Sequence, residues 1–262
     1  MTTFRRELTP AGSHLSLAVY SRRKSTESVF ATALELVRGS VESDSRYLET
    51  APRRVLDDET VDVQEVLTEV DFGENSVPAG LTVGDDRLPV RAYVRTKRFG
   101  PIVVERVMVF DRTLRERQAV EAHLADEELG IPAEHWSGKD RRRAEARYSW
   151  ASELFRRMCV ATDALYGQLV NEATLPTPAQ ILDGIPVEGA VFLSAEAIGS
   201  SQEFIETMRA RYGRDVATEL DNGVLLDGLV PFGKTGVTYR NSREFTAEIT
   251  GFLARRLRAL AR

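Results

Sequence analysis

The stretch 227–237, DGLVPFGKTGV, contains the residue types that hold phosphate in nucleotide-hydrolysing proteins. Gly228–Thr235 fits the letter pattern of a P-loop, in which backbone N–H groups, a lysine (here Lys234) and a hydroxyl bind the phosphates. The interior of the stretch argues against this use, because Pro231 has no N–H to donate. A P-loop also opens directly into a helix, whereas the next helical pattern begins only near Ser242. We therefore predict no nucleotide binding here, with a P-loop protein as an alternative.

His14-Leu15-Ser16 is a second element whose side chains could do chemistry. A histidine can act as acid or base near neutral pH, and a hydroxyl can hold phosphate. The element resembles half of the two-histidine phosphoesterase signature, which places two His-x-Ser/Thr elements on neighbouring strands. His123 is followed by Leu-Ala and supplies no hydroxyl, and His135 lies in a loop between helix breakers. A phosphoesterase-like enzyme that uses His14 and Ser16 remains an alternative, but the sequence predicts no complete catalytic site.

Acidic residues in two polar segments are candidates for contact with a protein partner. Surface carboxylates can steer and orient a basic partner. The simpler interpretation for each of them is a solvated charge that aids solubility. The candidates are Asp57, Asp58, Glu59, Asp85 and Asp86.

The composition bounds the classes of function. The 262 residues carry 35 Lys and Arg against 40 Asp and Glu, so the net charge is −5 and the chain is a poor general binder of nucleic acid. The single cysteine, Cys159, excludes an internal disulfide and a multi-cysteine zinc site, and no His/Glu spacing is typical of a metal site. We expect no metal or cofactor. No apolar run approaches the roughly 20 residues that span a bilayer, and the first residues lack the apolar core of a signal peptide, so a cytoplasmic location is expected.

Hydrophobic periodicity predicts groups of strands and helices. Alternation around Val90 and Val94, followed by the turn at Phe99-Gly100-Pro101, predicts a hairpin with one wet face. Asn222-Gly223 between two apolar runs favours a type I′ hairpin, and Asn241 is expected to cap the last helix. The expected strands are 14–21, two within 86–111, 167–173, 189–198, 215–220 and 224–230. The expected helices are 26–38, 61–70, 113–128, 141–165, 201–213 and 242–259, with a helical turn at 177–184, and 40–60 is expected to be irregular.

These elements predict an α+β protein with a mainly antiparallel sheet and helices packed on it. Residues 1–262 are expected to form a single α+β unit, because no segment has the composition of a flexible linker. The charged segment 112–143 is expected to be a helical insertion in that unit.

The order of these elements resembles that of the immunity protein 52 family and related type VI immunity proteins. The opening strand, the Arg- and Ser-containing turn and the helix appear as LAVYSRRKSTESVFATALELV, and a β-rich middle follows. A helix then ends near ALYGQLV, a Gly-apolar strand appears as VEGAVFLS, and the hairpin VATELDNGVLLDGL precedes the closing helix. The resemblance spans most of residues 14–258.

The resemblance implies a non-catalytic cytoplasmic protein that neutralises a cognate bacterial toxin by binding it. Its partner would be a protein, with no role for nucleic acid or membrane. A phage- or defence-associated protein with another partner would have the same features and is a further alternative.

Overall fold

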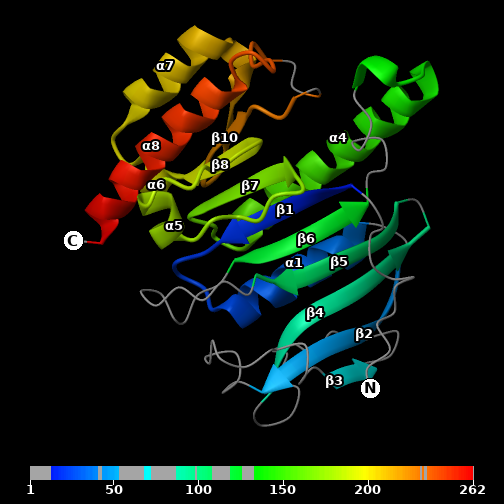
Figure 1. Ribbon diagram of the computed structural model, residues 1–262. Coiled ribbons are helices and arrows are strands. Elements are labelled where there is room, and N and C mark those ends of the chain that lie inside the picture. The colour runs from blue at the N-terminus through cyan, green and yellow to red at the C-terminus, as the bar shows by residue number, and fades with distance from the viewer. Residues whose placement is uncertain are drawn as a thin grey trace.

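The computed structural model of the chain contains one twisted antiparallel sheet with helices on both faces (Figure 1). The strands follow the order β3-β2-β4-β5-β6-β1-β7-β8-β10-β9, and each pair of neighbours is antiparallel. The α+β class and the antiparallel sheet are therefore confirmed. The structure describes residues 13–40, 43–52, 68–71, 87–97, 99–107, 119–125, 133–230, 232 and 235–261.

Along the chain, the elements of the first half of the sheet precede those of the second half. In the first half they are β1 (His14–Tyr20), α1 (Thr26–Ser40), β2 (Ser43–Pro52), β3 (Thr68–Asp71), β4 (Arg87–Thr96), β5 (Gly100–Arg106) and β6 (Val120–Ala125). In the second half they are α4 (Gly138–Ala161), β7 (Tyr166–Asn171), α5 (Pro178–Leu182), β8 (Ala190–Ser194), α6 (Ala195–Ile198), α7 (Gln202–Tyr212), β9 (Ala217–Leu220), β10 (Gly223–Asp227) and α8 (Ser242–Leu260). Short 3-10 helices occupy Ala133–His135 and Arg214–Val216.

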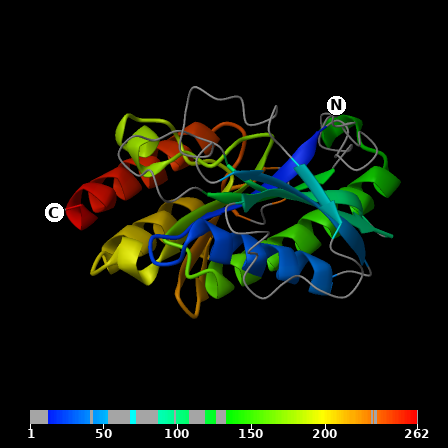
Figure 2. The same ribbon diagram turned by 90° about the horizontal axis from the view of Figure 1, so that it is seen from below.

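The helices divide between the two faces of the sheet. Figure 2 shows α1 and α4 on one side and α5 and α8 on the other. On the first face, α1 packs on β2, β4, β5 and β6, and α4 packs on β1 and β7. The second face is covered by α5, α6 and α8 only over the β7-β8-β10 half. Among the described residues, α1 is the helix that packs extensively on β4, β5 and β6, and it lies on the first face.

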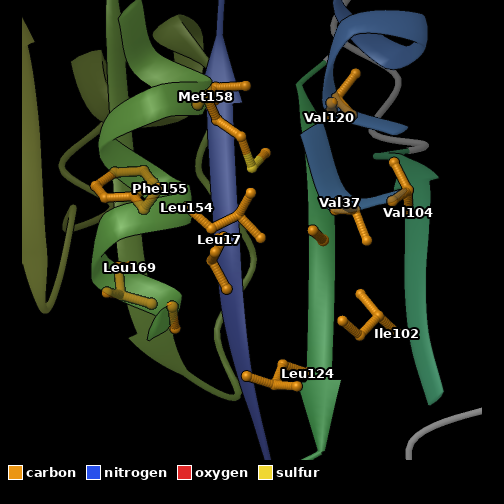
Figure 3. Close-up of a cluster of buried hydrophobic side chains, with 14 of the residues drawn as sticks. Leu17, Val37, Ile102, Val104, Val120, Leu124, Leu154, Phe155, Met158 and Leu169 are labelled. Carbon is orange, nitrogen blue, oxygen red and sulfur yellow. The ribbon is translucent and has the colours of Figure 1, made fainter. Parts of the chain in front are cut away.

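Alternate side chains along the strands are apolar and fill the core beneath α1 and α4. Leu15, Leu17 and Val19 of β1 point to that side, as do the alternate apolar residues of β5 and β6. Figure 3 shows Leu17 among side chains from α4, β6 and β7, with Val37 of α1 closing the cluster. Cys159 is fully buried in this core, as expected for a small hydrophobe. The labelled side chains in the figure are Leu17, Val37, Ile102, Val104, Val120, Leu124, Leu154, Phe155, Met158 and Leu169.

Three sequence-based assignments in the first half are wrong. Ser43–Pro52, expected to be irregular, is strand β2. Thr68–Asp71, whose first three residues were expected to end the helix 61–70, is strand β3 and pairs with β2. Val120–Ala125, expected within the helix 113–128 and the helical insertion 112–143, is the central strand β6. The reason is that Val120, Ala122 and Leu124 alternate with polar residues at a period of two, and tertiary pairing on both edges outweighs the local helical signal. Residues 61–67 lie outside the described part of the chain.

The second half follows the sequence-based expectations more closely. The hairpin β9–β10 is present, but its turn residues are Asp221 and Asn222, because Gly223 already pairs with Leu220. Neither turn residue has a positive φ, so the turn is not type I′. Gly223 is instead required by packing, since a Cβ there would meet the carbonyl oxygen of Leu193.

The boundaries of two further elements differ from expectation. The predicted strand 189–198 ends at Ser194, where the helix α6 begins. The helix α8 begins as predicted, but Asn241 makes no side-chain capping bond to it. The Asn241 amide oxygen instead accepts a hydrogen bond from the backbone N–H of Thr238.

Gly167 tests how tightly the centre of the sheet is packed. A Cβ at this position would lie 2.6 Å from the carbonyl oxygen of Ala18 and 3.1 Å from the Phe155 ring. Gly167→Ala is therefore expected to lower the free energy of unfolding by about 1–3 kcal/mol, measured by urea denaturation. Gly39→Ala is the matched control, because its Cβ meets nothing within 4 Å in α1. That control should keep or raise stability by up to about 1 kcal/mol. An equal response of the two variants would contradict this packing.

Candidate functional site

A row of charged residues crosses the second face of the sheet in its first half. Glu49 of β2 lies opposite Arg91 of β4, Arg91 lies opposite Glu105 of β5, and Glu105 lies opposite Glu121 of β6. Each of them has a strand neighbour in the α1 core, namely Leu48, Ala92, Val104 and Ala122, so the two-residue period places these four on the other face. We call these residues the charged row.

The charged row is joined by hydrogen bonds between side chains. Arg91 donates from Nε to Glu105 Oε2 at 2.7 Å and from Nη1 to Glu49 Oε2 at 3.2 Å. The Tyr93 hydroxyl donates to the other Glu49 oxygen at 3.1 Å. At the opposite end, the Leu175 backbone N–H donates to Glu121 Oε1 at 2.7 Å. The row is thus held from both ends.

His123 connects the charged row to β1. Its Nε2 lies 2.8 Å from Glu105 Oε1 and 3.4 Å from Glu121 Oε2, and its Nδ1 lies 3.1 Å from Ser16 Oγ. Ser16 is the direct cross-strand neighbour of His123 in the pairing of β1 with β6. The His14 ring packs edge-on against the His123 ring, with 5.0 Å between centroids.

Burial and mutual charge set the protonation of this cluster. Burial raises the pKa of Glu121 to about 7, and the Glu105 carboxylate adds to the shift. Burial alone would raise the pKa of Glu105 as well, but its hydrogen bond and charge interaction with His123, reinforced by Arg91, lower it to about 2. Burial opposes the charge on His123, yet the hydrogen bond to Glu105 and the two carboxylates raise the pKa of His123. These shifts favour a protonated His123 beside an ionised Glu105, with Glu121 ionised only above a pH of about 7.

The Ser16–His123–Glu105 order resembles a nucleophile–base–acid triad but differs from it in two respects. In a serine-hydrolase triad the hydroxyl bonds Nε2 and the carboxylate bonds Nδ1, whereas here the two ring nitrogens are exchanged. Ser16 is only 1% exposed, so its hydroxyl has almost no surface for a substrate. The arrangement fits a buried polar network better than an activated nucleophile.

The structure places the sequence-predicted site residues in different regions. His14 and Ser16 lie in the cluster, and His135 ends an exposed 3-10 helix. The partner-binding candidates remain predictions, because they lie outside the described residues; they are Asp57, Asp58, Glu59, Asp85 and Asp86.

The stretch Gly228–Thr235 follows β10, which is antiparallel to both of its neighbours. Gly228 packs against the Phe245 ring of α8, and α8 itself begins only at Ser242. Pro231, Gly233 and Lys234 lie outside the described residues. The part that is described lacks the direct strand-to-helix connection of a P-loop.

The sequence analysis missed Glu105, Glu121 and His123 as a group. These three residues each offer one ligand atom within 4.8 Å of the others, so they could hold a metal ion. The prediction of a helix at 113–128 concealed them, because it placed Glu121 and His123 on a charged surface. The alternation in VEAHLA was the signal that could have revealed both residues on one face of a strand.

Comparisons with known proteins give little further information. No family model and no curated protein matches the chain. Among solved structures, the chain is similar to the Pseudomonas aeruginosa T6SS protein PA0821, with a TM-score of 0.43 and 10% identity over 94% of this chain and 72% of that one. A likeness at this level carries no information on function. Within the described residues, no helix is both long enough and apolar enough to span a membrane.

Glu121→Gln tests the electrostatics of the cluster. The pKa of Glu121 is raised from 4.5 to about 7 in the folded protein, so its contribution to stability is full below pH 4.5 and is lost as pH rises through 7. The variant removes the buried charge. Its free energy of unfolding should therefore exceed that of the wild type by an amount that grows across this range, to at most about 3 kcal/mol near pH 8. Urea unfolding in the presence of a chelator measures this difference.

Glu203→Gln, on the exposed face of α7, is the control for this experiment. It should run parallel to the wild type across the same pH range. A constant or shrinking difference between Glu121→Gln and the wild type would contradict the buried-charge interpretation.

Proposed function

We propose that this chain is an immunity-type binding protein that neutralises a cognate bacterial toxin by occluding it, without catalysing a reaction. The observation that carries the proposal is the order of elements. The structure keeps the order of elements on which the resemblance is based: β1 with its Arg- and Ser-containing turn, α1, the β-rich middle, α4, β7 and β8, the acidic-turn hairpin and the closing α8.

The turn after β1 has a structural role that supports this resemblance. Arg23 bonds Glu196 at 2.8 Å and lies 3.6 Å from Asp163, and Arg22 bonds Glu196 at 3.2 Å. Lys24 also donates to the Ala161 carbonyl at 2.6 Å. The turn therefore connects the first strand and helix to the end of α4 and the start of α6. These contacts give the arginines of the turn a structural role.

The candidate site supports binding rather than turnover. Its titratable groups bond to one another across four strands, and its hydroxyl is buried. A protein that blocks a toxin requires a stable surface of complementary shape and charge, and a charge-compensated network beneath the sheet surface would help to hold such a surface in place.

Protection of cells is the direct test of the immunity role. The candidate toxin is the product of the gene adjacent to the one that encodes this chain. Co-expression of the two should restore growth, and the purified proteins should form a complex at or below micromolar concentration. If the neighbour is toxic, and this chain neither protects cells nor binds it, the immunity role is wrong.

Charge reversal tests the acidic candidates as the contact surface. Asp57→Lys with Asp58→Lys should weaken toxin binding by roughly 10-fold or more, mainly through slower association, because steering by complementary charge is lost. Glu203→Lys with Glu206→Lys changes the net charge equally on exposed α7 and should leave the affinity within about 2-fold. Equal losses from both pairs, measured by surface plasmon resonance, would assign the effect to net charge alone.

A phosphoesterase-like activity is the second candidate, and one observation favours it. His14-Leu-Ser16 and His123-Leu-Ala125 lie on neighbouring strands, with Ser16 opposite His123 and His14 opposite Ala125. This is the placement of a two-histidine site. It departs from the signature because Ala125 stands where the second hydroxyl would be.

Turnover of cyclic phosphodiesters distinguishes the two candidates. We expect no hydrolysis of cyclic or 2′,5′-linked substrates above that of the buffer, because both His123 nitrogens are engaged by Glu105 and Ser16. Measurable turnover by the wild type that His14→Ala abolishes, with the fold retained by circular dichroism, would overturn the non-catalytic proposal.

A further inference from the structure

We infer that Glu105, Glu121 and His123 form a binding site for a divalent transition-metal ion such as Zn²⁺ or Mn²⁺. The three ligand atoms are Glu105 Oε1, Glu121 Oε2 and His123 Nε2, and all lie within 4.8 Å of one another. Their separations from Nε2 are 2.8 and 3.4 Å. Metal–ligand bonds of ~2.0–2.1 Å in a tetrahedral site separate the ligand atoms by ~3.3 Å, so small side-chain shifts would admit the ion.

Each ligand is oriented by a partner on its other polar atom. Ser16 contacts His123 Nδ1, Arg91 holds Glu105 Oε2, and the Leu175 N–H holds Glu121 Oε1. Such outer contacts fix the direction of the ligand atom and, for histidine, the tautomer. The result is three groups from two adjacent strands whose remaining donor atoms converge on one point. A group of solvated surface acids lacks this support.

The electrostatics of the position also favour a cation. Glu105 and Glu121 are direct cross-strand neighbours with side chains 25% and 2% exposed, so two carboxylates meet where water screens them only in part. A divalent ion bound between them would offset this repulsion and accept the lone pair of a neutral imidazole. The mixed nitrogen and oxygen donors suit Zn²⁺ or Mn²⁺ better than Mg²⁺, which prefers oxygen ligands alone.

All three ligands lie within the strands β5 and β6, and none lies in a loop. Three protein ligands leave at least one coordination position for water or for a group from a partner. The inference stands apart from the immunity role, since it concerns the chain alone and is tested without a toxin.

Equilibrium dialysis of the full chain with Zn²⁺, followed by elemental analysis, tests the site. The wild type should bind one ion at micromolar or lower free Zn²⁺. Removal of an outer contact typically costs 10–100-fold in affinity, so loss of a ligand in Glu121→Gln should cost at least about 100-fold. This variant is chosen because it also removes a buried charge, which favours folding without the ion.

Glu49→Gln is the matched control. It makes the same substitution in the charged row, where Glu49 bonds Arg91 and Tyr93 but offers no ligand atom. Its Zn²⁺ affinity should stay within a few-fold of the wild type. Visible absorption of bound Co²⁺ gives a second readout, and Glu121→Gln should abolish that spectrum. Absence of stoichiometric binding at millimolar Zn²⁺, or equal affinities for the wild type and Glu121→Gln, would overturn the proposal.

Discussion

The first half of the sheet depends on how the buried Glu121 and the partly buried Glu105 are kept side by side. Strand pairing brings Glu105 and Glu121 directly opposite each other, in a place where burial makes every unbalanced charge costly. His123 lies between them and Arg91 lies on the far side of Glu105, so that positive and negative groups alternate across the strands. Without these cations, the β5–β6 pairing would carry an uncompensated buried repulsion. β6 also pairs with β1, and the contact between Ser16 and His123 extends the cluster to that strand.

The same strands explain why the protein has two cores instead of one. On the α1 and α4 side, apolar residues of the strands from β2 to β10 form one core, and the helices cover them. On the other side, the second core lies mainly over β7, β8 and β10, and on β1 Ala18 and Tyr20 belong to it whereas His14 and Ser16 belong to the polar cluster. The change from apolar to polar along one short strand marks the edge of the surface that α5, α6 and α8 bury. The chemistry-bearing residues gather beyond that edge.

Local patterns in the sequence were sufficient to predict the elements whose apolar residues all lie on one buried face. The α1 and α8 helices and the β4–β5 and β9–β10 hairpins were predicted because their periodicity and turns are local. The strand β6 was not, because its polar face carries Glu121 and His123, which also suit an exposed helix. The cluster itself could not be predicted from spacing, since Ser16 and His123 are 107 residues apart and meet only through strand pairing. The sequence of one strand shows which of its residues alternate. Which residues become cross-strand neighbours depends on the strand it pairs with.

The protonation state of His123 is the most direct measure of this balance of charge. In chelator-treated protein labelled with ¹⁵N-histidine, the imidazole of His123 should be observed by NMR with protons on both nitrogens, since Glu105 and Glu121 raise its pKa above 6.5. The imidazolium signals should persist above that pH, with the Nδ1 and Nε2 protons protected from exchange by Ser16 and Glu105. A His123 that titrates at or below 6.5, or whose ring protons exchange freely with water, would contradict a cation held between Glu105 and Glu121.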